Sequence, residues 1–431
     1  MRILVLSNEV WNDRINGNNV TSNWFEGMDA EFANIYASPD EPLNNCCQRY
    51  YQITDSMMLK SILKGIKAGK VLPVREYKTY NREAAAEAEP KKLYGFLKSI
   101  SGPFLRFVRE ELWLLGKYDV SGMKSFIDEF QPDVIFSERM ASCKMLRLEK
   151  IVSQLTDAPM FAFTGDDEYS LKQLSFSPFF WINRFMIRRR LRENVKKYKI
   201  YYTLSEEQGE YYEKIFGCNC KLLQKCGSFD GDMKKRTVGN PIRMIYAGKF
   251  YCNRWKMLGD IADVLREINK DTVKIILEIY TKDKPTEKQN KLLNDGRSSF
   301  IRGGVGQAEL AEKYKHADIA LHVESLDLKN RLATRYSFST KIIDCIFSGC
   351  AVMAYCWNQH SGLTYLKKRD AAICVSNLDE LKAILYSICD SPDRITQYAQ
   401  KAMECGNTYH RRAVVQANLL TDFMNGKSAD K

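Results

Sequence analysis

The sequence predicts an α/β protein built from two domains, each with a parallel β-sheet covered by helices on both faces. Two observations carry this prediction. Short β-branched or apolar segments alternate with longer segments of helical period along the whole chain. The length of 431 residues also exceeds that of a typical single domain.

The first half supplies one series of alternating elements. Segments that fit buried strands lie at residues 3–7, 32–36, 133–137, 159–163 and 200–204. Segments of helical period lie at residues 57–66, 93–116, 121–130 and 184–197. Strands separated by helices pair in parallel, because a parallel pair needs a long crossover connection. The first half therefore predicts one parallel sheet.

A turn-rich stretch, Cys226 to Asp232, precedes a second series of the same kind. Its predicted strands are residues 243–247, 273–280, 299–301, 319–323, 351–355 and 372–375. Its predicted helices are residues 255–268, 307–316, 341–348 and 378–388, followed by two further helical segments at 392–404 and 409–423. We place the boundary after residue 228. Ligands of such sheets bind at the carboxyl ends of the strands, where we expect the functional site.

A glycine and two basic residues follow the first strand of the second domain. Gly248 and Lys249 come directly after the strand, and Arg254 follows five residues later. Glycine lets the backbone approach a ligand closely, and two cations across one loop can hold a diphosphate from both sides. The alternative is an ordinary loop with solvated basic side chains.

Small hydroxyl residues and a lysine begin a later helix. Ser339 and Thr340 precede Lys341, and Asp344 lies three residues on, on the same face. The N–H groups of the helix start and the lysine would bind a diphosphate, whereas the carboxylate would accept hydrogen bonds from ribose hydroxyls. A capped helix with a surface Lys–Asp pair is the alternative.

These two motifs resemble the diphosphate clamp and the Glu-x7-Glu block of two-domain GT-B glycosyltransferases, specifically the retaining family 4. Residues 303–319 and 204–213 are similar to that family's approach to the nucleotide and its helix before the interdomain linker. The resemblance implies two Rossmann-like β/α/β domains facing a cleft. Residues 1–228 would bind the acceptor and 229–400 the donor, with a C-terminal helix in 401–431 packing back toward the N-terminal domain.

The same resemblance implies roles for individual residues. The residues that would bind the donor, a UDP or GDP sugar, are Gly248, Lys249, Arg254, Val305, Ser339, Thr340, Lys341 and Asp344. Lys249 and Arg254 would also stabilise the leaving diphosphate. Tyr336 replaces the first Glu of the family block, Asp344 shortens the second, and Lys249 replaces an Arg and loses its bidentate fork. Neither a metal ion nor another cofactor is expected.

Acidic residues follow a central strand of the first domain. This domain contains no histidine, so the histidine that many relatives place near the reacting sugar is absent. Asp166 and Asp167 follow the strand at 159–163 and can orient an acceptor hydroxyl or take its proton. Their alternative role is to cap the next helix. Glu138 and Arg139 are second candidates.

Positive charge is concentrated from Leu171 to Ile200. The chain has 65 Lys and Arg against 53 Asp and Glu, a net charge of +12. This segment has nine basic residues and one acid, so it contributes nine minus one, or +8. Aromatic residues lead into the basic helix, as in segments that lie on anionic lipid. The alternative is aromatic residues in the core and solvated arginines. Because no nucleic-acid motif accompanies the charge, we expect no nucleic-acid partner.

Composition excludes several other classes of protein. A content of 45% hydrophobic and 27% charged residues supports a packed core. No stretch approaches the roughly 18 apolar residues of a spanning helix, and the first residues lack the apolar region of a signal peptide. We therefore expect a cytoplasmic location, and the 13 cysteines are expected to be thiols.

The sequence thus predicts a glycosyltransferase of hexosyltransferase type, bound peripherally to the inner face of a membrane. It would move a sugar, with retention, from a nucleotide-diphosphate donor to a saccharide acceptor. The acceptor is expected to be lipid-linked, in bacterial-type surface polysaccharide or glycan assembly. Two alternatives stay open: a sugar-nucleotide 2-epimerase of GT-B fold, and a non-enzymatic basic scaffold that binds a membrane or nucleic acid.

Overall fold

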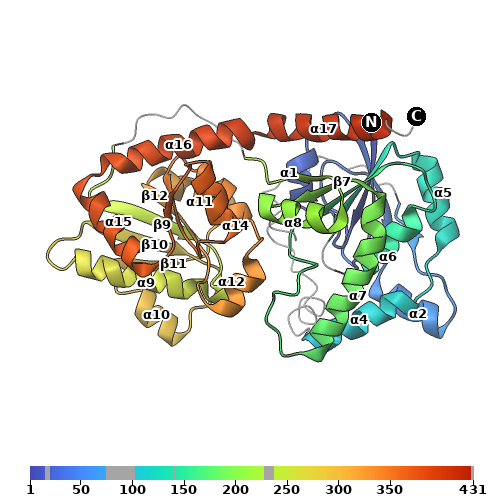
Figure 1. Cartoon of the computed structure of the whole chain (residues 1–431), viewed down its shortest axis with the longest axis horizontal. Helices are drawn as coiled ribbons and strands as arrows, with labels where there is room; N and C mark the ends of the chain where they lie inside the picture. The colour runs from blue at the N-terminus through green and yellow to red at the C-terminus, as the bar shows by residue number, and fades with distance from the viewer. Residues whose placement is uncertain (15–19, 74–101, 140–141, 228–236, 429–431) are drawn as a thin grey trace. The chain divides into compact units, whose positions relative to one another are not determined.

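Two compact units make up the chain. The computed structural model describes residues 1–14, 20–73, 102–139, 142–227 and 237–428 (Figure 1). Unit 1 comprises Met1–Gln224 and Val415–Lys431, and unit 2 comprises Lys225–Val414. Residues 401–414, which we expected to belong with the C-terminal helix, lie in unit 2. Each unit holds a largely parallel sheet, which confirms the predicted α/β class with two parallel-sheet domains.

Unit 1 contains an eight-stranded sheet that is parallel except for the antiparallel pair β3 and β4 at one edge. In spatial order its strands are β4 (Lys70–Val71), β3 (Arg49–Gln52), β2 (Glu31–Tyr36), β1 (Arg2–Ser7), β5 (Val134–Arg139), β6 (Met160–Thr164), β7 (Tyr198–Thr203) and β8 (Cys220–Leu222). Every residue of β6 is buried, as is every residue of β1 after Arg2. Consecutive buried residues along a strand are typical of a sheet that helices cover on both faces.

The helices that connect these strands are α1 (Val20–Phe25), α2 (Asp55–Leu63), α4 (Pro103–Leu115), α5 (Val120–Phe130), α6 (Cys143–Val152), α7 (Pro178–Asn194) and α8 (Glu206–Phe216). Most of α17 (Arg412–Ser428) also belongs to unit 1. Helix α7 packs against both α4 and α6. Of the helix predicted over 93–116, residues 93–101 lie outside the described part of the chain.

Helix α17 returns the end of the chain to unit 1. The ring of Phe423 is fully buried and packs 4.8 Å from that of Phe161 on β6. Asp422 accepts a hydrogen bond from Oη of Tyr202 at 2.9 Å, on β7. A Cβ added to Gly426 would stand 2.5 Å from Cζ of Phe161, so the helix approaches the strand too closely there for a side chain. The last helix is therefore part of the unit 1 core.

Unit 2 contains a six-stranded, fully parallel sheet. In spatial order its strands are β11 (Ser299–Gly303), β10 (Ile275–Tyr280), β9 (Ile242–Ala247), β12 (Ile319–Val323), β13 (Ala351–Tyr355) and β14 (Ile373–Val375). Its helices are α9 (Arg254–Ile268), α10 (Glu287–Leu293), α11 (Gln307–Lys315), α12 (Leu328–Thr334), α13 (Thr340–Ile346), α14 (Ser361–Lys368), α15 (Leu378–Asp390) and α16 (Asp393–Tyr409).

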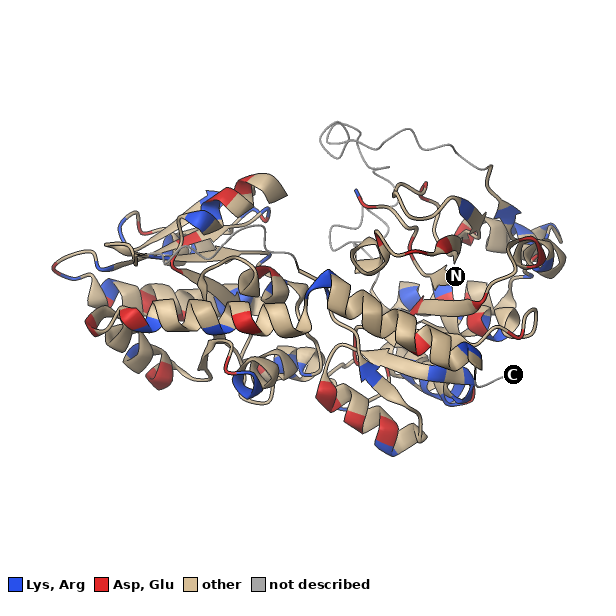
Figure 2. Cartoon of the chain, turned by 90° about the horizontal axis from the view of Figure 1, so that it is seen from above, with Lys and Arg blue, Asp and Glu red and all other residues tan. Residues whose placement is uncertain are grey.

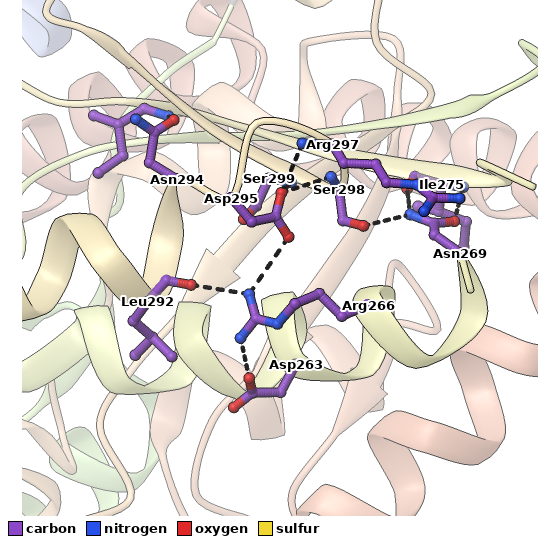
Figure 3. A network of polar contacts seen from close by, with 11 residues as sticks. Asp263, Arg266, Asn269, Ile275, Leu292, Asn294, Asp295, Arg297, Ser298 and Ser299 are labelled. Atoms are coloured by element: carbon purple, nitrogen blue, oxygen red, sulfur yellow. Dashed lines mark hydrogen bonds and ion pairs between the residues drawn. The ribbon is translucent and has the colours of Figure 1, made fainter. Parts of the chain in front are cut away.

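A polar network fixes the amino ends of β10 and β11 to the end of α9 (Figure 3). The carboxylate of Asp295 accepts hydrogen bonds from three successive backbone N–H groups, those of residues 297–299, at 2.7–3.0 Å. Asn269, just after α9, donates from Nδ2 to Ser298 Oγ at 2.9 Å and accepts at Oδ1 from the N–H of Ile275. These bonds satisfy backbone N–H groups at the edge of the sheet opposite the carboxyl ends of its strands.

Candidate functional site

The carboxyl ends of four unit 2 strands lie at one edge of the sheet. Because β9 to β12 are parallel, the residues that follow them share that edge. Gly248 follows β9, Asp283 lies beyond β10, Val305 lies after β11 and Glu324 follows β12. The backbone N–H of Phe250 donates to the Asp283 carboxylate at 2.6 Å and ties the first loop to its neighbour. The two predicted donor motifs meet at this edge.

The Lys341 ammonium group lies against Gly248. A Cβ added to Gly248 would stand 1.8 Å from Lys341 Nζ and 2.9 Å from Tyr246 Oη, so a larger residue would displace the lysine head. The same Nζ lies 5.4 Å from the centre of the Tyr246 ring. Burial, and next the charge of Arg254, lowers the pKa of Lys341 to about 8. Among the described residues Lys341 has no ion-pair partner, so its cation is available to an anion.

Arg254, the first residue of α9, is held in a buried ion pair. Its Nε donates to Oε2 of Glu324 at 3.1 Å, and its Nη2 donates to Oε1 of the same carboxylate. The two side chains are only 8% and 3% exposed. Burial opposes the charge, but Glu324 outweighs it and raises the pKa of Arg254. Arg254 therefore stays charged, with part of its donor capacity taken up by Glu324.

The loop between β9 and α9 contains two successive residues in the left-handed conformation. Cys252 has φ of 55° and Asn253 has φ of 59°, values that residues other than glycine seldom adopt. Asn253 Nδ2 donates to the Asp327 carboxylate at 3.0 Å, and Asp327 also accepts from Ser325 Oγ at 2.5 Å. These bonds support a strained backbone, which is common where a loop positions functional groups.

The other predicted donor residues are less enclosed. The side chain of Lys249 is exposed, and Ser339 and Thr340 are half-buried where α13 begins. Asp344, which we expected to face ribose, is exposed and forms an ion pair with Lys225 at 2.5 Å. These four residues contribute surface groups, in contrast with the buried Arg254.

The two predicted aspartates of unit 1 have different environments. Asp167 is buried, and its carboxylate accepts a hydrogen bond from the backbone N–H of Ser170 at 2.9 Å, as expected for a residue that caps a turn. The side chain of Asp166 is exposed, although desolvation by the surrounding protein and then the charge of Asp167 raise its pKa. Of the two, only Asp166 presents its carboxylate to solvent.

A second carboxylate stands near the end of β5, between β1 and β6. Glu138 accepts a hydrogen bond from Thr21 Oγ1 at 2.5 Å. Burial raises the pKa of Glu138 and the charge of Glu9 adds to this, whereas the bond from Thr21 lowers it. Glu9, Glu138 and Asp166 thus lie near the carboxyl ends of three adjacent parallel strands. Arg139 ends β5, and its side chain lies outside the described part.

Three arginines of segment 171–200 support the loop after β6. Arg184 is buried and donates from Nη1 to the carbonyl of Asp167 at 2.6 Å. The guanidinium groups of Arg188 and Arg192 lie 3.9 and 5.6 Å from the centre of the Tyr169 ring. Three of the nine basic residues of this segment therefore support the protein structure. Lys172, Arg189, Lys196 and Lys197 remain exposed.

Charged residues of both signs are distributed along the helices of both units (Figure 2). None of the helices in the described ranges combines the length and the hydrophobicity of a bilayer-spanning segment.

Several residues near the candidate donor site were not predicted. Glu324 and Asp283 follow strands whose positions were expected, but an isolated acid after a strand carries no sequence signal of its own. Tyr246 lies within the first strand of unit 2 and reads as a core residue in the sequence. The alternation of strands and helices gives the edge at which such residues lie, but it does not give their partners.

One stretch of the chain, most of it in unit 2, is similar to a known protein family. Residues 265–418 match a family model described as glycosyl transferase-like. This range includes Val305, Glu324, Lys341 and Asp344, but begins after Arg254. No match was found among curated proteins.

Solved structures resemble the whole chain. The UDP complex of Alr3699/HepE from Anabaena has a TM-score of 0.61 and 11% identity, covering 99% of this chain and 100% of that one. A UDP-forming α,α-trehalose-phosphate synthase from Burkholderia xenovorans, in complex with glucose-6-phosphate, has a TM-score of 0.58 and 9% identity, covering 98% and 100%. The solved structures confirm the predicted two-domain GT-B fold, and residues 265–418 are similar to the glycosyl transferase-like family.

Proposed function

We propose that this chain, with its glycosyl transferase-like domain in unit 2, transfers a sugar from a UDP-sugar to a saccharide acceptor. The similar Anabaena HepE was crystallised with UDP and with UDP-glucose, which makes UDP the first nucleotide to test. The donor would bind at the carboxyl edge of the unit 2 sheet and the acceptor at the corresponding edge of unit 1, since ligands of open α/β sheets bind at these edges.

The environment of Lys341 carries the proposal. A cation in a partly buried position loses hydration, and here that loss is not offset by an ion pair among the described residues. A diphosphate beside Gly248 would supply the missing negative charge. Lys249, exposed in the same loop, would add a second positive charge at the surface.

Preorganised positive charge is the main catalytic requirement of this reaction. As the bond from the sugar to the diphosphate breaks, negative charge develops on the departing oxygen, and fixed cations lower the barrier most. Arg254 is the most rigidly held cation of the site, because Glu324 binds two of its nitrogens. We assign stabilisation of the leaving group to Lys341, Lys249 and Arg254.

The remaining groups would recognise the rest of the donor. Asp344 would accept hydrogen bonds from ribose hydroxyls, with Lys225 holding its carboxylate in place. Ser339 and Thr340 would offer hydroxyl and backbone N–H groups, and Val305 an apolar contact. The exposed position of Asp344 leaves its second carboxylate oxygen open to such a ligand.

For the acceptor, we assign Asp166 as the group that orients the attacking hydroxyl. Its carboxylate is exposed, whereas that of Asp167 is committed to Ser170. Retention is the stereochemical outcome we propose, in line with the family that the motifs resemble. The leaving diphosphate would then take the proton of the hydroxyl, and NMR of the product anomer would test this assignment.

Calorimetry with UDP, UDP-glucose and GDP tests the donor site. Binding of UDP should weaken by at least about tenfold in Lys341→Ala, because a desolvated charge–phosphate contact is among the strong hydrogen bonds. Lys291→Ala, an exposed lysine on α10, is the matched control and should bind as wild type does. Unchanged UDP affinity in Lys341→Ala, or no binding of any nucleotide diphosphate, would disprove the site.

Incubation of the enzyme with donor alone separates the two enzymatic possibilities. A transferase needs a saccharide acceptor to turn over beyond slow hydrolysis, whereas a 2-epimerase would change the sugar of the donor itself. NMR of the sugar nucleotide with and without a panel of acceptors distinguishes these outcomes.

The acceptor that we propose is lipid-linked, and α4 with α7 would bind the membrane. The exposed large apolar side chains of these helices and the loop before α7 are Phe104, Leu105, Val108, Leu115, Leu171, Leu174, Phe176, Ile182 and Phe185. The two helices pack together through ring contacts of Phe104 and Phe107 with Phe179. Exposed apolar residues beside exposed Arg189 and Lys196 suit the interface of an anionic bilayer.

Vesicle flotation tests the membrane assignment. The protein should float with vesicles of phosphatidylglycerol and phosphatidylcholine, less so with phosphatidylcholine alone, and Phe176→Ser with Phe185→Ser should abolish flotation. Tyr386→Ser, an exposed aromatic change on α15, is the control. Flotation that survives the double change would refute the assignment. Loss of vesicle binding when nucleic acid is added as a competitor would also refute it.

A further inference from the structure

Three potential metal ligands lie together in the interior of unit 2. His322 is on β12, Cys356 directly follows β13, and His360 precedes the first residue of α14. All three side chains are buried, and one ligand atom from each lies within 4.8 Å of those of the other two. Residues 322, 356 and 360 show no spacing typical of a metal motif, so the topology of the sheet brings them together.

Both histidines have a buried ring nitrogen without a hydrogen-bond partner among the residues that the structure describes. These atoms are Nε2 of His322 and Nε2 of His360, in rings whose centres lie 6.2 Å apart. Buried polar atoms are nearly always paired, because an unpaired one costs about 1–3 kcal/mol. Two such atoms beside a buried thiol call for a ligand that accepts nitrogen and sulfur donors together.

We propose that His322, Cys356 and His360 bind a zinc ion. Zinc accepts imidazole nitrogen and thiolate sulfur as ligands, with bonds of about 2.0–2.3 Å. Ligand atoms around such an ion stand roughly 3.3–3.8 Å apart, so the cluster would contract by about 1 Å. The ion would join β12, β13 and α14, near the strand ends that carry the candidate donor site.

The surrounding charges partly balance such an ion. The charge of Arg254 acts on all three residues and opposes a bound cation, as does that of Lys341 on His322. The charge of Glu324 acts on Cys356 and His360 and favours a cation. The thiolate of Cys356 removes one further positive charge when the ion binds. The thiol proton is released to solvent, so zinc affinity should increase as pH rises.

One hydrogen bond must change for His360 to bind zinc through Nε2. Its Nδ1 accepts the N–H of Gly362 at 3.1 Å, so the neutral ring carries its proton on Nε2. Zinc binding moves that proton to Nδ1 and ends the bond from Gly362. Amide hydrogen exchange at Gly362 should therefore become faster in the zinc-bound protein.

Zinc and cobalt titrations of the full-length, chelator-treated protein test the proposal. We expect one zinc ion per chain and, with cobalt, a thiolate-to-metal charge-transfer band that reports the Cys356 bond. His322→Gln and Cys356→Ser should each weaken zinc binding by more than about tenfold. Loss of a residue that only hydrogen-bonds to a metal ligand already lowers metal affinity by about 10- to 100-fold, and loss of a ligand should cost at least as much. Cys356→Ser should also remove the charge-transfer band.

Matched controls separate this site from binding at the surface. His316→Gln changes an exposed histidine and Cys374→Ser a cysteine on the neighbouring strand β14, and neither should alter zinc affinity or the cobalt spectrum. Wild-type protein that binds no stoichiometric zinc, or binds cobalt without a thiolate band, overturns the proposal even if the buried variants fail to fold. Equal zinc affinity in Cys356→Ser also overturns it. The titrations do not depend on sugar transfer, so they test the metal site independently of the proposed function.

Discussion

Lys341 has a protonation state that changes just above neutral pH. Because burial lowers its pKa to about 8, the ligand-free protein loses this proton as the pH rises through that value. A bound diphosphate would hold the proton and raise the pKa again. Diphosphate binding at this site is therefore linked to proton uptake above pH of about 8.

We predict that UDP affinity falls above pH of about 8, by at most about tenfold per pH unit, because the charged lysine is required. Calorimetry in two buffers of different ionisation enthalpy should detect proton uptake on binding. Lys341→Met should bind UDP more weakly and lose the pH dependence. A slope that persists in Lys341→Met would assign the titration to another group.

The pair of Arg254 and Glu324 makes a second prediction for single residues. Glu324→Gln leaves a buried guanidinium without its counter-charge and should destabilise the protein by about 3–5 kcal/mol. The double variant Arg254→Met with Glu324→Met should recover much of this stability, since a buried ion pair replaced by apolar groups is often neutral. Urea unfolding of Arg254→Met, Glu324→Met and the double variant gives the coupling energy of the pair, and additive effects would contradict the prediction.

The same pair should separate stability from catalysis. The double variant lacks a fixed cation near Lys341, so we expect lower turnover even where stability has recovered.

Among the elements, the network at the amino ends of β10 and β11 should stabilise unit 2 without affecting the donor site. Asp295→Ala removes the acceptor of three backbone N–H groups and should cost about 1–3 kcal/mol. Asp263→Ala, which removes an exposed partner of Arg266, should cost less than about 1 kcal/mol. Denaturant unfolding measures both. UDP affinity should stay unchanged in each variant, because the candidate donor site lies at the other edge of the sheet.

The sequence predicted elements best where packing imposes a simple pattern. β12 and β13 begin and end at the predicted residues, since both are short, fully buried and apolar apart from His322. Helix α6 was not predicted. It is buried on several faces, and its buried residues include Lys144 and Glu149, so its apolar residues do not recur with a clear helical period. β3, β4 and β8 are two to four residues long, too short to show an alternation.

The site was less predictable than the elements that carry it. Gly248 and Lys341 were recognisable because a loop after a strand and a helix start each have a known relation to phosphate. Their direct contact, and the ion pair of Arg254 with Glu324 across 70 residues, depend on the order of strands in the sheet. The arginines of α7 show the same limit, since charge alone does not distinguish Arg184 inside the protein from Arg189 at its surface.

At the scale of the whole molecule, the chain leaves unit 1 at Gln224 and returns to it at Val415. Unit 1 is thus built from two separate segments of the chain, whereas unit 2 is continuous in sequence. The returning helix α17 contributes a buried aromatic ring and a buried carboxylate to the unit 1 core. The stability of unit 1 should therefore depend on a helix that is distant in sequence from all of its strands. The hydrogen bond between Tyr202 and Asp422, for example, joins residues that are 220 positions apart.

Phe423→Ala tests this dependence in the full-length protein. Phe423 is fully buried and touches the rings of both Phe161 and Phe136, so its removal leaves a cavity and should cost about 3–5 kcal/mol. Met424→Ala, at the neighbouring position of the same helix, removes a side chain that is 53% exposed and should cost less than about 1 kcal/mol. Hydrogen exchange followed by mass spectrometry should locate the loss of protection in β5, β6 and β7, while the strands of unit 2 keep theirs. Equal effects of the two variants, or a loss of protection spread over both units, would mean that α17 is not an integral part of the unit 1 core.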